Sequence, residues 1–205
     1  MPDEGRNVDI ARSMLESGDF WRPRLVGNLY LDKPPLHFWT LAAGMAVFGQ
    51  NEWGARIPHA LLYLATAFLL GALAARMWDA STGKTTTWVY ALMLGPFAAG
   101  SVVTPDTPLA LFIVATFYGT WRACENGNPR ENSAWWLFVG VAVGLAFLTK
   151  GPAVLMIGPS IVVFLLARKR LFSTLAVPAL WGGVFLALAL GASWYVPICR
   201  ALPGA

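Results

Sequence analysis

The 205-residue sequence predicts an all-α integral membrane protein, and three observations support this fold class. Hydrophobic residues make up 57% of the chain and charged residues 13%, whereas about a quarter of the residues in a soluble domain are charged. Charge is concentrated, with 11 of the 26 charged residues in the first 33 positions and long apolar runs after them. Backbone inside a bilayer must satisfy its own hydrogen bonds, so these runs are expected to be helices. The composition excludes disordered, nucleic-acid-binding and disulfide-scaffold proteins.

The chain divides into a charged region, residues 1–52, and a hydrophobic region, residues 53–205. In the charged region, apolar residues recur at helical spacing before the stop at Ser17-Gly18, which predicts a short amphipathic helix and then an ordered loop. The run from Leu36 to Phe48 is too short to cross a bilayer and predicts a helix along the membrane surface. Residues 1–52 are therefore expected to form an extracytoplasmic loop with interfacial helices, and residues 53–205 a transmembrane bundle.

Six apolar segments of the hydrophobic region approach the roughly 17–25 residues that a membrane-spanning helix needs. They cover residues 55–77, 85–104, 105–123, 133–150, 151–168 and 173–197, so six spans are predicted. Glycines such as Gly140 and Gly183 predict close packing between these helices. Tryptophans near their ends, including Trp136 and Trp194, predict an aromatic belt at the membrane surface.

Basic residues predict the orientation of the chain. With the N-terminal region outside, the inner connections carry seven basic residues, and the outer turns after residue 56 carry only Lys150 and Arg200. This is the bias expected when basic loops stay inside. Five basic residues before Pro34 oppose the bias, but six acids accompany them, and a site for an anionic ligand would also collect them.

Acids and cations gather on the predicted outer face, where they could form a site. They are Asp3, Glu4, Arg6, Asp32, Lys33, Asp106 and Lys150, and Tyr30 stands two residues before Asp32. A carboxylate beside a cation suits a site that activates a hydroxyl and holds a phosphate. Taken singly, Lys150 could extend to the headgroups, and Asp106 could simply begin a helix. His37 and His59 are interpreted as packing or interfacial residues, because two isolated histidines lack metal-site spacing.

Several ordered blocks resemble type C glycosyltransferases. Asp3-Glu4-Gly5-Arg6 and residues 10–19 resemble the first extracytoplasmic loop of bacterial relatives of dolichyl-phosphate-mannose–protein mannosyltransferases and of the lipid A aminoarabinose transferase. Tyr30-Leu31-Asp32-Lys33-Pro34-Pro35-Leu36 matches the next block. Residues 51–56, 105–108 and 148–152 continue the resemblance, which covers nearly the whole chain.

The resemblance implies a type C glycosyltransferase fold and a multi-pass enzyme of the bacterial inner membrane. Such an enzyme transfers a sugar, with inversion, from a polyprenyl-phosphate donor to a lipid, glycan or protein acceptor outside. The resemblance points to Asp3 as catalytic base or acceptor-positioning residue, supported by Glu4. It assigns the donor phosphate to Lys33, with Arg6 and Lys150 as further cations, and supporting places to Tyr30, Asp32 and Asp106. With a phosphate or carboxylate acceptor no base is required, and Asp3 would only orient the acceptor.

Other possibilities stay open at this stage. Asp32 stands where many relatives carry the longer Glu, and a divalent metal is possible although no metal ligands are assigned. The resemblance implies that the chain corresponds to helices two to seven of a larger enzyme, and the fragment alone could be inactive. A non-enzymatic transporter or lipid flippase is the alternative from another class, and it predicts ionisable residues near mid-membrane.

Overall fold

The computed structural model describes residues 2–125 and 132–201, and nearly all of the regular structure in them is helical. Two helices come first, α1 (Pro2–Ser17) and α2 (Leu36–Phe48), with a short hairpin of β1 (Arg24–Leu25) and β2 (Asn28–Leu29) between them. The following elements are α3 (Glu52–Met77), α4 (Ala80–Leu92), α5 (Leu94–Ser101), α6 (Asp106–Cys124), α7 (Ala134–Lys150), the 3₁₀ helix η1 (Gly151–Met156), α8 (Ile157–Ala167), α9 (Leu171–Leu175) and α10 (Pro178–Ala201).

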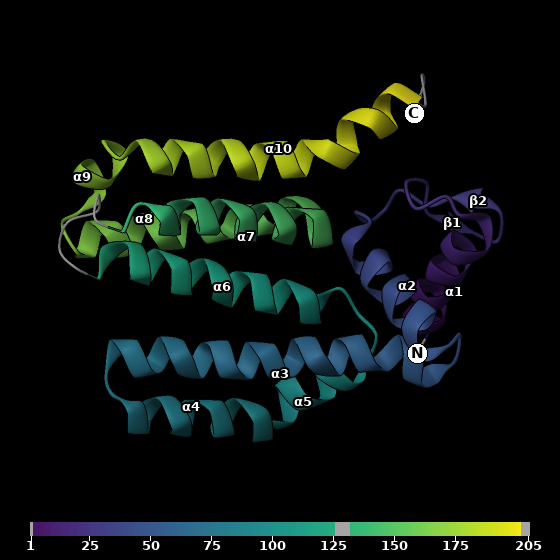
Figure 1. Cartoon of the computed structure of the whole chain (residues 1–205), viewed down its shortest axis with the longest axis horizontal. Coiled ribbons are helices and arrows are strands. Elements are labelled where there is room, and N and C mark those ends of the chain that lie inside the picture. Colours follow the sequence, from purple (N-terminus) through teal and green to yellow (C-terminus); the bar gives the residue numbers. More distant parts are fainter. Residues whose placement is uncertain (1, 126–131, 202–205) are drawn as a thin grey trace.

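The long helices lie side by side in a row that runs from α10 through α7, α6 and α3 to α4 (Figure 1). Helices α1 and α2 and the hairpin form a separate layer at one end of the long helices (Figure 1). The first residues of α3 and α6 and the last residues of α7 and α10 lie at the same end. The prediction of an all-α membrane fold is therefore confirmed, with the small hairpin as an addition.

Each predicted apolar segment is helical over most of its length, but two predicted boundaries are wrong. Residues 85–104 form two helices, α4 and α5, because Pro96 lacks an amide hydrogen and its ring clashes with the preceding turn, so the first helix ends before it. Residues 173–197 do not form one helix, since α9 ends at Leu175 and α10 begins at Pro178. Proline is favoured at the first position of a helix, where no intrahelical bond is lost.

The segment 151–168 begins with a reversal of the chain. Gly151 has a φ of +63°, a conformation that favours glycine, and it ends α7 immediately after Lys150. Among the described residues, three helical stretches have the length and apolar composition needed to cross a membrane, namely 52–77, 134–167 and 178–201. The second of them comprises α7, η1 and α8 and so includes this reversal. The number of six spans stays a prediction.

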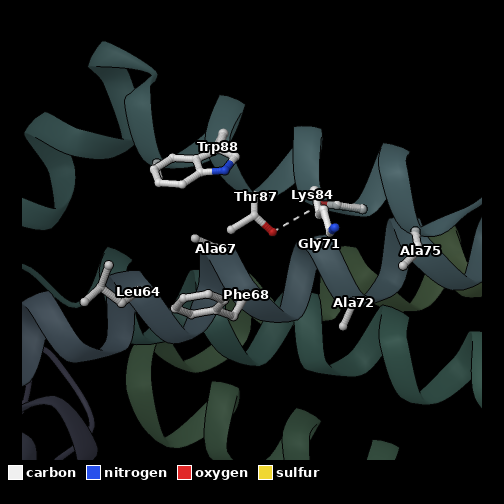
Figure 2. Close-up of a pocket in the computed structure, with 12 residues that line it drawn as sticks. Leu64, Ala67, Phe68, Gly71, Ala72, Ala75, Lys84, Thr87 and Trp88 are labelled. Atoms are coloured by element: carbon white, nitrogen blue, oxygen red, sulfur yellow. Dashed lines mark hydrogen bonds between the residues drawn. The ribbon is translucent and has the colours of Figure 1, made fainter.

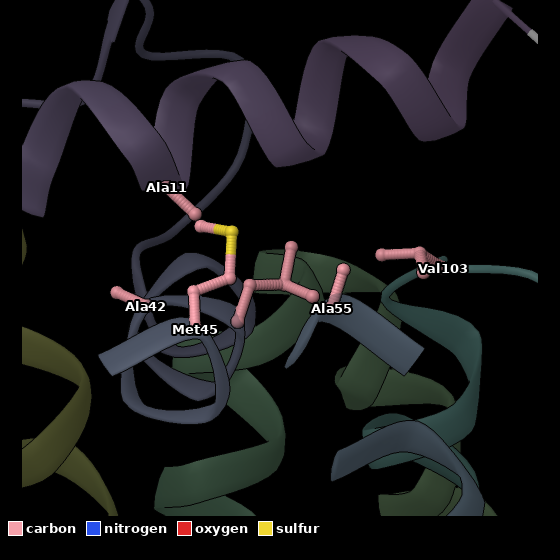
Figure 3. Packing of buried hydrophobic residues seen from close by; sticks show 6 residues of the cluster. Ala11, Ala42, Met45, Ala55 and Val103 are labelled. Carbon is pink, nitrogen blue, oxygen red and sulfur yellow. The ribbon is translucent and has the colours of Figure 1, made fainter. Parts of the chain in front are cut away.

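The elements predicted for the N-terminal region are present. Helix α1 ends at Ser17, and Gly18 follows with a φ of +69°. Helix α2 has the predicted bounds, and Gly49, with a φ of +90°, separates it from α3. The side chain of Asn51 accepts the amide hydrogen of Gly54 and caps α3. The layer is packed on the bundle through a buried cluster of Ala11, Leu41, Ala42, Met45, Ala55 and Val103 (Figure 3).

The predictions for glycine and tryptophan had different outcomes. A Cβ on Gly140 would overlap the Gly183 carbonyl, so α7 and α10 are in contact through their backbones, as predicted. Trp136 and Trp194 are each 1% exposed, so their assignment to an aromatic belt is wrong. Both rings are buried between helices, and the Trp194 indole donates to the Trp21 carbonyl at 2.9 Å.

Candidate functional site

All eight predicted site residues belong to the end of the bundle that carries α1 and α2 (Figure 1). Asp3, Glu4 and Arg6 lie in the first turns of α1, while Tyr30, Asp32 and Lys33 lie in the loop before α2. The other two residues are on the bundle itself, with Asp106 as the first residue of α6 and Lys150 as the last of α7. Four segments of the chain therefore place charged side chains at one end.

Asp3 and Arg6 form the first ion pair of this end. They are three residues apart on α1, which puts them on one face, and the Arg6 guanidinium donates to Asp3 Oδ1 at 2.6 Å. The same guanidinium lies 5.5 Å from the centre of the Tyr30 ring, within cation–π range. Its Nε is buried and has no hydrogen-bond partner among the described residues. Arg6 therefore connects α1 to the loop before α2.

Tyr30 and Asp32 continue this group. The Tyr30 hydroxyl donates to Asp32 Oδ2 at 3.0 Å. Burial raises the pKa of Tyr30 above its usual value, and the hydrogen bond to Asp32 raises it further. At neutral pH the phenol is thus protonated and remains a hydrogen-bond donor. Asp3, Arg6, Tyr30 and Asp32 form one continuous polar group.

Asp106 and Lys150 form the second ion pair, which joins the start of α6 to the end of α7. An acid at a helix N-terminus and a cation at a C-terminus are both favoured by the helix dipole. The two side chains are also partly exposed, at 56% for Asp106 and 39% for Lys150. Lys150 consequently has a protein partner and does not simply extend to the headgroups.

Glu4 faces a different part of the surface from Asp3. Consecutive residues of a helix point about 100° apart, and the Glu4 carboxylate lies 3.3 Å from the Arg56 guanidinium of α3. Both line a surface pocket of about 480 Å³, together with Asp9, Arg12 and Glu52 among others. The geometry thus separates two acids that are adjacent in sequence.

Lys33 is half-buried, and it has no ion pair within residues 2–125 and 132–201. The prolines that follow it bring it toward the turn after α7, since a Cβ at Gly151 would lie 3.8 Å from Pro34 Cγ. Its charge also lies close enough to His37 to lower the pKa of that ring. Lys33 therefore belongs to the same end of the bundle as Lys150.

Two residues that sequence reasoning gave no site role hold the segment before Asp106. The Asn7 amide donates to the Val103 carbonyl at 3.1 Å, and His59 Nε2 lies 3.1 Å from the Thr104 carbonyl oxygen. A polar Asn on the buried face of α1 was the available signal. No group of three or more His, Cys, Asp or Glu side chains suited to a metal ion occurs in the described part of the chain.

A larger groove lies away from these residues, between α3 and α4 (Figure 2). It has a volume of about 510 Å³ and an apolar lining that includes Leu64, Phe68 and Trp88, and Lys84 also lines it. The close approach of the helices at Gly71 and Gly83 forms its floor. Lacking acids, this groove does not meet the requirements of the predicted site.

Comparison with known proteins identifies similar chains. Residues 32–196 match the family model described as dolichyl-phosphate-mannose-protein mannosyltransferase. The chain is 32% identical over 155 residues to the undecaprenyl phosphate-alpha-4-amino-4-deoxy-L-arabinose arabinosyl transferase of Pseudomonas aeruginosa strain UCBPP-PA14, covering 74% of this chain and 28% of that protein. An uncharacterized protein of Aquifex aeolicus is 31% identical over 197 residues, which cover 96% of this chain and 38% of the relative.

Solved structures give the same result. The ArnT protein of Cupriavidus metallidurans is similar in its apo state, with a TM-score of 0.88, and bound to undecaprenyl phosphate, with a TM-score of 0.90. Each structure is 27% identical to this chain in sequence, and the two cover 99% and 100% of it. The chain spans 38% of the ArnT chain and 28% of the P. aeruginosa relative.

Proposed function

Because this chain belongs to the dolichyl-phosphate-mannose-protein mannosyltransferase family, we propose that it is part of a membrane glycosyltransferase with a polyprenyl-phosphate-linked sugar as donor. The sugar would be transferred, with inversion, to a lipid, glycan or protein acceptor. We place the reaction at the outer face of a bacterial inner membrane. The relatives are bacterial proteins, and one is named for transfer of 4-amino-4-deoxy-L-arabinose.

The observation that carries this proposal is the grouping of acid–cation pairs at one end of the bundle. Asp3 pairs there with Arg6, and Asp106 pairs with Lys150. Lys33 lies at the same end and has no acidic partner among the described residues. A similar protein is known in complex with undecaprenyl phosphate. Cations beside carboxylates are suited to bind a phosphate and to activate a hydroxyl at one place.

The proposed roles follow from what each group can do chemically. Lys33 would balance the charge that grows on the phosphate as the bond between it and the anomeric carbon of the sugar breaks. Arg6 and Lys150 are the further cations for that phosphate. The Asp3 carboxylate would accept the proton of the acceptor hydroxyl while its oxygen forms the new bond to the anomeric carbon. One displacement of this kind inverts that carbon and releases polyprenyl phosphate.

The remaining residues would support these groups. Asp106 would hold Lys150, and Tyr30 with Asp32 would fix the position of Arg6. Glu4 is paired with Arg56 on another face of α1. It would therefore fix the position of the first turn of α1 and would not accept the proton of the acceptor hydroxyl. If the acceptor is itself a phosphate or carboxylate, Asp3 would orient it without acting as a base.

The transporter alternative is less well supported by the geometry. It requires ionisable groups along a path through the membrane, whereas Asp106, Lys150 and Arg56 all lie at or near helix ends. The close likeness to ArnT favours the enzyme. The assay uses the full-length protein, so that inactivity of this chain on its own does not affect the outcome.

The experiment is sugar transfer by the full-length protein in membranes, with polyprenyl-phosphate sugars and nucleotide sugars compared as donors. Transfer from the lipid-linked donor alone is expected, with inversion of the anomeric carbon. Lys33→Ala should weaken donor binding about 10–100-fold, the range for one lost charge-assisted contact. Lys84→Ala, at the other end of the bundle, is the matched control and should bind donor normally. Transfer from nucleotide sugars, or retention at the anomeric carbon, would contradict the proposal.

A further inference from the structure

Two histidines and an asparagine form a buried polar cluster beneath the candidate site. His37 of α2 and Asn7 of α1 are 0% exposed, and His59 of α3 is 1% exposed. The two imidazole rings meet edge to face, with centres 5.2 Å apart and planes at 89°. Buried polar side chains normally have hydrogen-bond partners, and several atoms of this cluster have none among the described residues, which calls for an explanation. The proposed reaction uses none of these three side chains.

The contacts of His59 define the tautomer of its neutral ring. A carbonyl oxygen only accepts hydrogen bonds, so the contact of 3.1 Å from His59 Nε2 to the Thr104 carbonyl requires the proton on Nε2. The other ring nitrogen, Nδ1, is then a bare acceptor, and it has no hydrogen-bond partner among the described residues. Neutral His59 therefore donates to Thr104 from Nε2, while its Nδ1 is buried and carries no proton.

The cluster holds the segment that leads into Asp106. Asn7 binds the Val103 carbonyl, and His59 binds the next carbonyl, that of Thr104. Thr104 lies two residues before Asp106, whose carboxylate pairs with Lys150. The N-terminal layer and α3 thus fix two consecutive peptide groups, and this sets where α6 begins and where its first side chain points.

We propose that neutral His59 is a positioning residue for Asp106, acting through the Thr104 carbonyl, and that His37 keeps the His59 ring in place. The consequence for catalysis rests on the proposed function, because Asp106 in turn holds Lys150 near the donor phosphate. The position of the segment itself does not depend on that function.

A second proton on His59 would have to enter at Nδ1 and would create a buried charge beside His37. Neither nitrogen of His37 has a hydrogen-bond partner in the described part of the chain, so it offers no compensation. Glu4 of α1 faces His59 and would attract that charge, but Glu4 is already paired with Arg56. Lys33, in the loop before α2, lies near His37 and opposes any charge there. The segment 102–105 contributes no titratable side chain. The second proton leaves the bond from Nε2 to Thr104 intact, and the backbone at Ala55 offsets part of the new charge. Acidification should therefore loosen this segment through the cost of burying the remaining charge, which draws water into the cluster.

The first test measures amide hydrogen exchange in the full-length protein. His59→Leu removes the donor, whereas His59→Gln keeps an N–H at the position of Nε2 and cannot be charged. Thr66→Val is the control, since Thr66 is equally buried on α3 but bonds within its own helix, to Leu62. Exchange over residues 102–109 should speed up at least about tenfold in His59→Leu and stay unchanged in His59→Gln and Thr66→Val.

Unchanged exchange in His59→Leu would overturn the proposal. If His59→Leu does not fold, acidification decides instead. Both proteins then carry His37→Phe, which removes the other titrating ring of the cluster. With His59 present the segment should lose protection at low pH, after correction for the intrinsic rate, and with His59→Gln it should retain protection. Equal loss in both proteins would also overturn the proposal.

The second test is a double-mutant cycle with Asp106→Asn in the transfer assay. Each single variant, His59→Leu and Asp106→Asn, should raise the donor KM about tenfold, the scale of one charge-assisted contact. The double variant should be no worse than Asp106→Asn alone, because both changes act on the same group. Losses that multiply to about a hundredfold would overturn the proposal. If the wild type transfers no sugar from the lipid-linked donor, the proposed function fails, and the exchange experiment still decides the position of the segment.

Discussion

At the scale of single residues, the acids at the start of α1 show how helix geometry separates neighbours. Asp3 pairs with Arg6 and stays 64% exposed, whereas Glu4 contacts Arg56 and is 19% exposed. The two carboxylates therefore have different partners, and removing each should have a different effect. Asp3 is the one that shares a face with Arg6 and with the loop before α2.

Asp3→Asn should lower the turnover rate of the full-length enzyme while leaving donor binding little changed. The amide keeps the size of the side chain but cannot accept the hydroxyl proton, and general-base catalysis contributes about 10²–10⁴-fold. The measurement is kcat for a hydroxyl acceptor, with the donor Kd determined separately. Asp9→Asn is a matched control, because Asp9 is an exposed acid of the same helix paired at i, i+3 with Arg12. Near-normal turnover in Asp3→Asn would refute the role of Asp3 as base.

His37 should make the stability of the protein depend on pH. Burial lowers its pKa well below the usual value, and the neighbouring His59 and Lys33 lower it further. In the unfolded chain the pKa of the ring is about 6.5, so below that pH the unfolded state binds more protons than the folded state. Stability is therefore complete above about pH 6.5 and declines as the pH falls toward the folded pKa.

His37→Phe tests this dependence, because phenylalanine keeps the edge-to-face packing and cannot titrate. The melting temperature of the wild type in detergent should fall from about pH 7 to about pH 5, and the variant should lose less over the same range. Thr66→Val serves again as the control and should follow the wild type. Parallel curves for His37→Phe and the wild type would show that this ring does not cause the decline.

At the scale of elements, small sequence signals set where helices end and how closely they pack. Pro96 separates α4 from α5, and Gly151 reverses the chain after Lys150. The second of these matters for the site, because it leaves Lys150 as the last residue of α7, where its ammonium can reach Asp106. Glycines at the contact of α7 and α10 instead control the distance between two helices.

Gly140→Ala should destabilise the protein, although alanine is the better helix former. The new Cβ would overlap the backbone of Gly183, and overpacking of this kind costs about 1–3 kcal/mol. Gly158→Ala is the matched control, since nothing lies within 4 Å of its added Cβ. That control should be neutral or more stable by up to about 1 kcal/mol. The measurement is thermal unfolding in detergent, and equal effects at both positions would contradict this account of the interface.

At the scale of the whole molecule, the N-terminal layer is fixed to the bundle at several distant points. Trp194 near the end of α10 donates to the Trp21 carbonyl, Asn7 binds the segment before α6, and Pro34 lies beside the turn at Gly151. These contacts gather the candidate residues at one end, so the orientation of the chain in the membrane decides which compartment the site faces.

Cysteine labelling of intact cells tests that orientation. Asn28 lies exposed in the hairpin of the N-terminal layer, and Ser173 lies exposed in α9 at the other end of the bundle. In a background with Cys124 and Cys199 replaced by serine, a membrane-impermeant maleimide should label Asn28→Cys and not Ser173→Cys. Permeabilised cells should show both labels. Labelling of Ser173→Cys alone in intact cells would place the candidate site inside.

Much of the fold and part of the site could be predicted from the sequence. Hydrophobic length marked the helical segments, and the bounds of α2 were predicted correctly because Pro34-Pro35 and Gly49 delimit the run. The buried places of Trp136 and Trp194 were missed, because residues near a helix end look the same in sequence whether lipid or protein surrounds them. The separate partners of Asp3 and Glu4 were missed because they depend on where Arg56 lies.

The sequence by itself determined the membrane character of the chain, its helical segments and the residue types available for a site. These follow from local physical chemistry, since apolar length, proline, glycine and charge act within a few residues of one another. Only the tertiary structure decided that Asp106 meets Lys150, that Arg6 contacts Tyr30, and that His59 holds the carbonyl of Thr104. These pairings join elements up to 45 residues apart, and their geometry depends on how the helices pack, which no local pattern encodes.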